Sequence, residues 1–355
     1  MLTILAGCAT TEEIKETDSD ELLNQGIAFI EEGQYDRAIA YFNKAIEINP
    51  RFADAYTGRG LAYEYKGQHD KAISDFNKAI EINPSNAEPY YSRGLTYFRK
   101  GQYDKAISDF NKAIEINPRF ALAYYNRGLA YAKGKGQHDK AISDFNKAIE
   151  INPRDAKAYF GKGVAYGEKH QYDKAISDFN KAIEINPRDA WAYRNRGLVY
   201  FRKSQYGEAI SDFNKAIEIN PRFAMAYNNR GLAYFRKGQY DEAISDYNKA
   251  IEINPRDAEA YNNKAWLLAT CRDAIYRDGA KAVELAKKAV ELDANASMLD
   301  TLAAAYAEVG KFDDAITTQE KAIELLKKEG KPTPVIDQFI ESLKSYKAHK
   351  PWREK

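Results

Sequence analysis

Cysteine is almost absent from this chain of 355 residues, in which only Cys8 and Cys271 occur. A disulfide framework is therefore excluded as the basis of the fold. Long apolar runs are missing too: no stretch reaches about 18 apolar residues, so the sequence predicts no transmembrane helix. Neither sign of charge dominates, since 53 Lys and Arg residues stand against 52 Asp and Glu residues. Such a balance gives no overall field that would attract nucleic acid or anionic lipid.

Residues that carry chemistry are also scarce. The histidines, His69, His138, His170 and His349, show no metal-ligand spacing, and no glycine-rich phosphate loop follows a strand pattern. Carboxylates are abundant, but they recur with a fixed period, which indicates solvent-exposed faces and helix caps. We therefore expect a protein that is not an enzyme and that binds no metal or other cofactor.

A repeat dominates the rest of the sequence. Residues 224–257 read AMAYNNRGLAYFRKGQYDEAISDYNKAIEINPRD, and near-copies precede them. A proline closes each copy, at intervals of 34 residues with one step of 35: Pro50, Pro84, Pro118, Pro153, Pro187, Pro221 and Pro255. A fixed period of this length is typical of a stacked solenoid rather than of a single globular core.

Each copy predicts a helical hairpin. In the first helix Tyr227, Gly231 and Tyr234 fall on one face, at i, i+4 and i+7. Residues 237–239 break that helix, and an apolar three-four spacing over 243–251 indicates a second one. Because glycine in a helix costs roughly 1 kcal/mol relative to alanine, its recurrence predicts a contact too close for a methyl group. The glycines at this place are Gly26, Gly60, Gly94, Gly128, Gly163, Gly197 and Gly231.

The ends of the second helix have their own residues. Asp241 is expected to cap its start by accepting backbone N–H groups. Pro255 ends it, because proline has no donor and pushes Asn254 out of helical geometry. In one copy Gly207 replaces the aspartate, so that helix should begin less firmly. Another copy has an extra residue within 133–136, which we expect a surface loop to absorb.

These places resemble the consensus of the tetratricopeptide repeat family, which alternates aromatic and small residues and ends on proline. One copy fills them with Tyr56, Gly60, Tyr63, Ala72, Phe76, Ala79 and Pro84. The resemblance covers about residues 19–329. It implies an all-α fold, namely a right-handed superhelical solenoid of about nine helix-turn-helix repeats.

The expected division of the chain follows the period. Residues 1–8 fit a lipoprotein signal remnant and 9–18 a polar tether, and the solenoid occupies 19–329. Its repeats lie near 19–52, 53–86, 87–120, 121–155, 156–189, 190–223, 224–257, 258–295 and 296–329. An apolar face over 334–347 predicts a further helix that caps the last hydrophobic surface.

One departure from the family consensus needs a physical account. Repeats two to seven have a basic residue just before the small one, where leucine is usual, and an aspartate in the second helix. The pairs are Arg59/Asp75, Arg93/Asp109, Arg127/Asp144, Lys162/Asp178, Arg196/Asp212 and Arg230/Asp246. We predict an ion pair between the two helices of each repeat, with the basic stem packed on apolar surface.

The first residues are similar to a bacterial lipobox, in which a cysteine is cut free and lipidated. They end in Leu5-Ala6-Gly7-Cys8, although the basic n-region of a secretory signal is absent and the apolar part is short. Lipidation of Cys8 would anchor the protein to a membrane without spanning it. The alternative is an ordinary N-terminus with a free thiol. Cys271, on an apolar helix, is expected to be a buried small hydrophobe.

In the family, places two, five, six, twelve and thirteen of a repeat usually face a groove that holds a peptide. In repeats six and seven these places hold Trp191, Arg194, Asn195, Phe201, Arg202, Met225, Asn228, Asn229, Phe235 and Arg236. Interface anchors are enriched in Trp and Arg, and methionine adapts to varied partners. The resemblance therefore implies a protein or peptide partner.

Asparagine recurs within this set. Place six holds Asn24, Asn126, Asn195, Asn229 and Asn263, and Asn262 occupies place five of the eighth repeat. Side-chain amides can donate to and accept from a peptide backbone. The row is similar to the asparagine ladder in the tetratricopeptide region of a protein-modifying sugar transferase, but water could equally be its partner. The carboxylate clamp of co-chaperone members is absent, because place nine holds apolar residues.

Together these observations favour a protein–protein interaction adaptor, tethered to a bacterial cell envelope through Cys8. Two alternatives stay open: a soluble cytoplasmic scaffold and a regulatory subunit of an enzyme complex. The sequence does not identify the partner.

Overall fold

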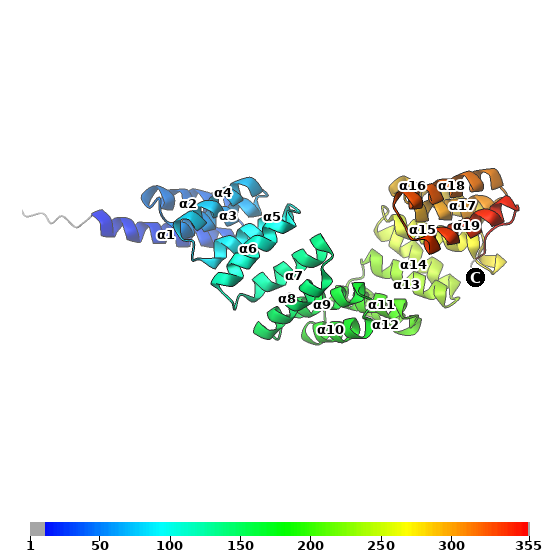
Figure 1. The fold of residues 1–355 in the computed structure, drawn as a ribbon, viewed down its shortest axis with the longest axis horizontal. Coiled ribbons are helices and arrows are strands. Elements are labelled where there is room, and N and C mark those ends of the chain that lie inside the picture. Colours follow the sequence, from blue (N-terminus) through cyan, green and yellow to red (C-terminus); the bar gives the residue numbers. More distant parts are fainter. Residues whose placement is uncertain (1–10, 354–355) are drawn as a thin grey trace, which may run out of the picture. The chain divides into compact units, whose positions relative to one another are not determined.

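The computed structural model describes residues 11–353, and the side chains of residues 19–353. Throughout this range the chain forms helices and turns and contains no strand (Figure 1). It divides into an N-terminal part that ends at Ile185 and a C-terminal part that begins at Asn186. Each part is a series of helical hairpins. The predicted all-α class is confirmed, and the chain has a helical repeat solenoid fold.

The helices alternate between the two members of a hairpin, so that odd-numbered helices up to α17 are first helices. The N-terminal part contains α1 (Thr11–Glu31), α2 (Tyr35–Ile48), α3 (Ala53–Tyr65), α4 (His69–Ile82), α5 (Ala87–Arg99), α6 (Tyr103–Ile116), α7 (Ala121–Lys135), α8 (His138–Ile151), α9 (Ala156–Glu168) and α10 (Tyr172–Ile185). The C-terminal part contains α11 (Ala190–Arg202), α12 (Tyr206–Ile219), α13 (Ala224–Arg236), α14 (Tyr240–Ile253), α15 (Ala258–Thr270), a 3-10 turn (Ala274–Tyr276), α16 (Gly279–Leu292), α17 (Ala296–Glu308), α18 (Phe312–Lys328) and α19 (Thr333–Lys347).

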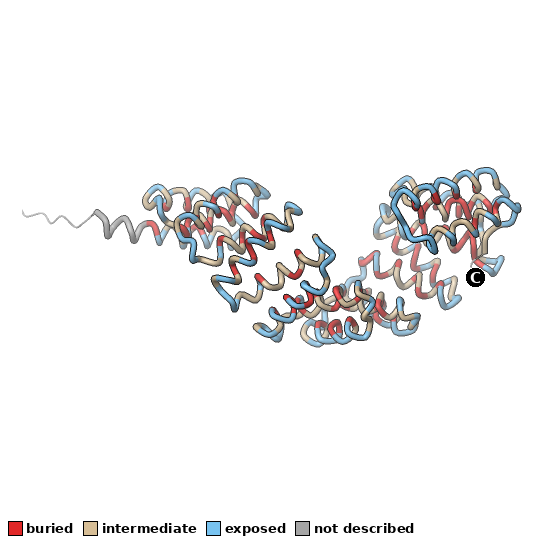
Figure 2. The backbone as a smooth tube through the Cα atoms, in the orientation of Figure 1, coloured by how far each residue is buried: buried red, intermediate tan, exposed pale blue. Residues whose placement is uncertain are grey.

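The core of a hairpin is an aromatic ring from the second helix seated on the glycine of the first. A Cβ atom placed on Gly60 would lie 2.6 Å from a ring carbon of Phe76, whose side chain is fully buried. At the seven equivalent glycines this separation is 2.5–3.0 Å. The predicted close contact is therefore confirmed. Buried residues recur along the helices, and the turns between them are mostly exposed (Figure 2).

The predicted ion pairs are present in all six repeats. Their shortest nitrogen–oxygen distances are 2.6–2.9 Å. The basic group also lies over the tyrosine three residues earlier, as where Arg59 Cζ is 5.4 Å from the ring centre of Tyr56. The charged group thus lies over an aromatic ring, while the packing of its stem on apolar surface stays a prediction.

The expected aspartate cap of the second helices is wrong. The helix α14 begins at Tyr240, which places Asp241 inside its first turn, and the N-cap is Gln239, whose side chain makes no capping hydrogen bond. Aspartate caps α11 instead, where Asp189 accepts from the backbone N–H groups of Trp191 and the next residue, and among second helices Asp278 caps α16. A short carboxylate is a good acceptor for the N–H groups left unpaired at a helix start.

Two related expectations concern helix ends. The helix α12 carries Gly207 and begins at Tyr206, the place at which its equivalents begin, so how firmly it begins stays a prediction. The extra residue near 133–136 does not enlarge a loop, because α7 continues to Lys135 and ends on Gly136 in the left-handed conformation.

The ends of the chain differ in how far they are described. Cys8 and the rest of residues 1–10 lie outside the described range, so the lipoprotein hypothesis stays a prediction. Residues 11–18 of the expected polar tether have helical backbone within α1. At the other end, α19 lies where the capping helix is expected and packs on α18 and α17. Cys271 is buried, as predicted, and burial raises the pKa of its thiol.

Candidate functional site

The residues predicted to bind a partner lie mostly on one surface of the C-terminal part. We use the name first-helix face for the surface formed by places two, five, six, twelve and thirteen of α11, α13, α15 and α17. These first helices pack in succession, each against the next (Figure 1). Asn126 belongs to the N-terminal part, where its side chain donates to the hydroxyl of Tyr91 at 3.1 Å and to the carbonyl of Leu122 at 2.9 Å.

Trp191 is the largest exposed apolar side chain on this face. It sits at place two of α11 and is 48% exposed. The ring of Phe223, the residue before α13, meets it edge-on at 4.8 Å between centroids. The guanidinium carbon of Arg194 lies 5.8 Å from its ring centre. A tryptophan held on one side and open on the other is the kind of residue that dominates binding energies at protein interfaces.

Arg194 carries a positive charge that no acidic residue balances. Its Nε donates to Asn229 Oδ1 at 2.9 Å, and in the described part of the chain it forms no ion pair. Burial consequently lowers its pKa. Arg196, two residues on, differs: its hydrogen bond to Asp212 outweighs burial and raises its pKa. The face therefore holds a partly buried cation beside an exposed indole.

The asparagines of places five and six bond to one another across neighbouring helices. Asn263 Nδ2 of α15 donates to Asn228 Oδ1 of α13 at 3.0 Å, just as Arg194 reaches Asn229 from the preceding helix. Asn195 instead donates to the carbonyl of Trp191 at 2.8 Å. The bonds of Asn263 to Asn228 and of Arg194 to Asn229 therefore connect successive repeats.

Burial separates the predicted residues into two groups. Asn228, Phe235 and Asn262 are 8%, 8% and 5% exposed, so they offer little surface to a partner. Their expected contact with a peptide stays a prediction. Exposed residues are Trp191, Arg202, Met225 and Arg236, and half-buried ones are Arg194, Asn195, Phe201, Asn229 and Asn263.

Several residues that matter here were not predicted. Leu122 is 51% exposed at place two of the fourth repeat, a position that the place rule could have found. The C-terminal part also has a cavity of about 550 Å³, lined by Arg236, Trp266, Asp300, Gln338, Phe339, Glu341, Ser342 and Trp352. Burial raises the pKa of Asp300 to about 6, against the lowering effect of its hydrogen bond from Gln319. Trp352 lies outside the repeats, so no periodic pattern could place it.

Other kinds of site find no support in the described residues. No group of three or more His, Cys, Asp or Glu side chains is arranged to hold a metal ion in that range. None of the helices described is both long and apolar enough to cross a membrane.

Comparison with protein-family models also identifies the helical repeats. Models described as tetratricopeptide repeat match residues 53–86, 156–189, 224–257, 76–108, 179–211, 246–277 and 296–326. A model described as TPR repeat matches residues 26–65, 94–134, 135–170 and 199–238. Together the matches cover residues 26–277 and 296–326. This chain belongs to the tetratricopeptide repeat family. Proteins of this family mediate protein–protein interactions.

Several solved structures are similar to this chain. A tetratricopeptide repeat protein from Parabacteroides merdae is 24% identical, with 70% of this chain and 97% of that chain covered and a TM-score of 0.55. The Cut9–Hcn1 hetero-tetramer of APC/C contains a chain that is 22% identical, with coverages of 82% and 56% and a TM-score of 0.57. YrrB, described as a TPR protein with an unusual peptide-binding site, is 30% identical over 52% of this chain and 95% of that one, with a TM-score of 0.45. No curated protein matches the sequence significantly.

Proposed function

We propose that this tetratricopeptide repeat protein is a non-enzymatic adaptor that binds a segment of another protein on the first-helix face of α11 and α13. The observation that carries the proposal is the pairing of Trp191 with Arg194. An indole that is 48% exposed lies beside a guanidinium that has no ion pair among the described residues. Both residue types are enriched at interface hot spots.

The chemistry of the face favours an acidic partner segment with an apolar side chain. Arg194 would gain a carboxylate that the described residues do not supply. Met225 is 39% exposed, and its flexible side chain can adapt to the partner's apolar residue. Charge-assisted hydrogen bonds to arginine are short and directional, so Arg194 would also fix the orientation of the segment.

The test begins by capturing the partner with a photo-crosslinking amino acid at position 225 in cells that express the chain. Its binding is then measured with three single variants: Trp191→Ala, Arg194→Gln and Asn229→Ala. We expect Trp191→Ala and Arg194→Gln to weaken binding at least tenfold, roughly the loss of a single interface anchor, and Asn229→Ala to weaken it less. The helical content should not change.

A matched control removes an exposed apolar side chain elsewhere. Ile275 is 81% exposed on the 3-10 turn before α16, so Ile275→Ala should leave the affinity unchanged. Equal affinity of the Trp191→Ala and Arg194→Gln variants and the unaltered chain would place the interface elsewhere.

For location, we propose that Cys8 is lipidated and anchors the protein in a bacterial envelope. The support is the run Leu5-Ala6-Gly7-Cys8, together with an adaptor role that needs no membrane-spanning segment. Metabolic labelling with an alkyne fatty acid should modify the natural chain and spare the Cys8→Ser variant. An unmodified N-terminus in intact-mass spectrometry would favour a soluble scaffold instead.

A further inference from the structure

The segment that follows α19 turns back onto the first helices of the last two repeats. The turn is held by two hydrogen bonds: Lys350 N donates to the carbonyl of Ser345 at 3.0 Å, and Ser345 Oγ donates to the carbonyl of Lys350 at 2.9 Å. The ring of His349 stacks on Phe312 of α18 at 5.0 Å between centroids. Pro351 follows, and the direction of residues 352–353 is thereby set.

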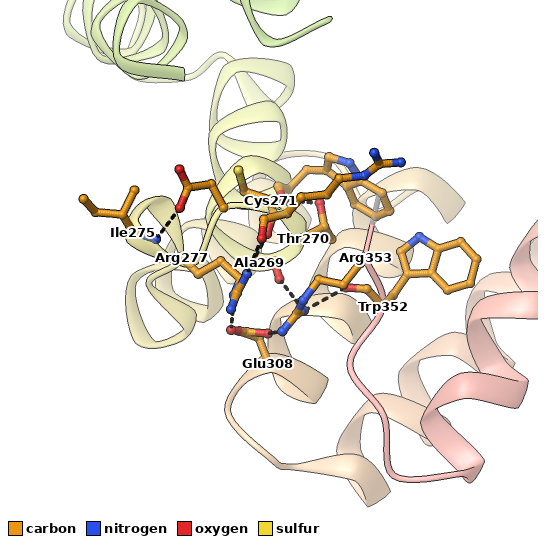
Figure 3. Close-up of polar contacts among 11 residues, drawn as sticks. Ala269, Thr270, Cys271, Ile275, Arg277, Glu308, Trp352 and Arg353 are labelled. Carbon is orange, nitrogen blue, oxygen red and sulfur yellow. Dashed lines mark hydrogen bonds and ion pairs between the residues drawn. The ribbon is translucent and has the colours of Figure 1, made fainter. Parts of the chain in front are cut away.

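Residues 352–353 occupy the first-helix face of α15 and α17. Arg353 Nη1 donates to the carbonyl of Ala269 at 3.3 Å, and its Nη2 lies 2.6 Å from Glu308 Oε2 in an ion pair (Figure 3). Trp352 packs against the buried cluster that includes Ala265 and neighbouring residues of both helices. Ala269 and Glu308 hold places twelve and thirteen of their repeats, which are places that line the peptide groove in the family.

Glu308 is held ready for a guanidinium by a second arginine that does not belong to the tail. Arg277 Nε lies 3.0 Å from Glu308 Oε1, while Arg277 Nη1 donates to the carbonyls of Cys271 and Arg272 (Figure 3). Since Glu308 is only 13% exposed, Arg277 fixes one of its oxygens and leaves the other directed at Arg353. The acceptor is therefore in place before the tail arrives.

Place thirteen of the first helices changes from basic to acidic along the face. Place thirteen holds Arg202 in α11, Arg236 in α13 and Thr270 in α15, whereas it holds Glu308 in α17. A basic side chain is thus favoured at α17. The negative charge of Glu308 matches the positive charge of Arg353, which the chain itself places beside it.

We propose that α15 and α17 form a binding site for an aromatic residue followed by arginine, and that Trp352 and Arg353 fill it as a ligand within the same chain. A partner protein that carries an aromatic–arginine pair displaces the tail and takes its contacts with Ala269 and Glu308. The proposal adds a second recognition site to the proposed function. It is tested without altering Trp191 or Arg194, so either proposal can fail alone.

The tail is suited to displacement because its ion pair with the repeats comes from Arg353, which is partly exposed. Arg353 is 34% exposed, pairs with the Glu308 carboxylate and donates to the carbonyls of Ala269 and of its own neighbour Trp352. While the tail occupies the site, a competing segment can bind only the molecules whose site is free. Its apparent affinity is therefore reduced in proportion to that free fraction. Removing the resident arginine should therefore increase the affinity for an added segment.

The experiment measures a fluorescein-labelled peptide of sequence KAHKPWREK, which copies residues 347–355, by anisotropy against the full chain. We expect the Arg353→Ala chain to bind this peptide at least tenfold more tightly than the unaltered chain does. The double variant Arg353→Ala, Glu308→Gln should bind the peptide at least tenfold more weakly than the Arg353→Ala chain. A peptide in which alanine replaces the arginine should bind the Arg353→Ala chain at least tenfold more weakly.

Glu291→Gln in the Arg353→Ala background is the matched control, because Glu291 is an exposed carboxylate of α16 paired with Lys288, and it should leave peptide affinity unchanged. If Arg353→Ala does not fold, Arg353→Lys is used instead. Lysine keeps the charge but lacks the guanidinium that reaches two acceptors, so we expect an intermediate gain in peptide affinity. Peptide affinity that is equal in the folded Arg353 variant and the unaltered chain would overturn the proposal, since the tail would then be a fixed cap. A dimer in sedimentation that the peptide dissociates would also overturn the assignment to a partner, because the occupant would be a second copy.

Discussion

The guanidinium of Arg59 holds both carboxylate oxygens of Asp75, with Nη2 2.7 Å from Oδ1 and Nε 2.7 Å from Oδ2. Its remaining nitrogen, Nη1, donates to Asn43 Oδ1 at 2.6 Å. Asn43 belongs to α2, Arg59 to α3 and Asp75 to α4, so a single side chain joins three helices of two successive repeats. Arg93, Arg127 and Arg230 make the same set of contacts in their own repeats.

Replacing Asp75 by alanine should lower the free energy of unfolding by about 2–3 kcal/mol, because it leaves a partly buried guanidinium without its carboxylate. Asp70 is a matched control in the same helix, since it pairs with Lys100 at the surface and its side chain is 90% exposed. Asp70→Ala should have a much smaller effect, because exposed ion pairs contribute little. Urea denaturation followed by circular dichroism measures both. Similar losses in the two variants would contradict a special role for the inter-helix pair.

This contact shows how far the sequence predicts the structure. The pair of Arg59 with Asp75 could be predicted, because a basic residue and an aspartate recur together at these places in repeats two to seven, and the first and ninth repeats lack both. The eighth repeat breaks the match, with Lys264 but Leu285. The bond to Asn43 could not, because it depends on how one hairpin is rotated against the previous one, and a period fixes only the spacing along the chain.

The candidate site, too, could be predicted only in part from the sequence. Trp191 and Arg194 follow from their places in the repeat, and their exposure and contact follow only from packing. Asn228 and Asn262 occupy places equivalent to that of Arg194 but are buried. Trp352 and Arg353 lie beyond the last repeat, where there is no period from which to extrapolate a position.

Adding one methyl group to Gly60 should destabilise the hairpin of α3 and α4. The new Cβ would lie 2.6 Å from the ring of Phe76, which is fully buried and cannot move aside freely. Overpacking of this kind costs about 1–3 kcal/mol, which exceeds the roughly 1 kcal/mol that alanine gains over glycine in a helix.

Gly207→Ala is the control for that substitution. Gly207 is also helical, in the first turn of α12, but no atom lies within 4 Å of a Cβ placed there. This variant should raise the midpoint of thermal unfolding, whereas Gly60→Ala should lower it. Two shifts of the same sign would show that helix propensity, and not the ring contact, decides the outcome.

The turn between the two helices of each repeat offers a test of backbone conformation. Gly67 has φ +71°, and the equivalent place in the sixth repeat is Ser204, with φ 59°. The left-handed region costs a non-glycine residue roughly 1–2 kcal/mol. Ser204→Gly should therefore stabilise the chain by about 0.5–1 kcal/mol after the greater chain entropy of glycine is counted.

The reverse substitution, Gly67→Ala, should destabilise it by about 1 kcal/mol. No neighbouring atom lies within 4 Å of a Cβ at Gly67, so the loss would come from the backbone alone. Differential scanning calorimetry of the two variants measures both shifts. If Ser204→Gly lowers the unfolding temperature, the serine side chain must contribute a contact that outweighs the strain.

Asp300 should make the stability of the C-terminal part depend on pH. Burial raises its pKa from the ordinary 3.8 to about 6, although Gln319 Nε2 donates to its Oδ1 at 2.6 Å. Between these two pH values the folded state binds more protons than the unfolded state, so stability falls as pH rises from about 4 to about 6 and then levels off. Arg236 and Glu341 line the same cavity, so their charges also face this carboxyl.

Asp300→Asn should therefore stabilise the chain at pH 7, because it removes a charge that the folded state disfavours. A difference of about 2 pKa units corresponds to at most about 3 kcal/mol. The gain should shrink towards zero near pH 4, where the aspartic acid is already neutral. Asp337→Asn, at an exposed carboxylate of α19, is the control and should show no such pH-dependent gain. Urea midpoints at intervals from pH 4 to pH 8 give the curve, and a gain from Asp300→Asn that is constant over this range would mean that Asp300 does not titrate within it.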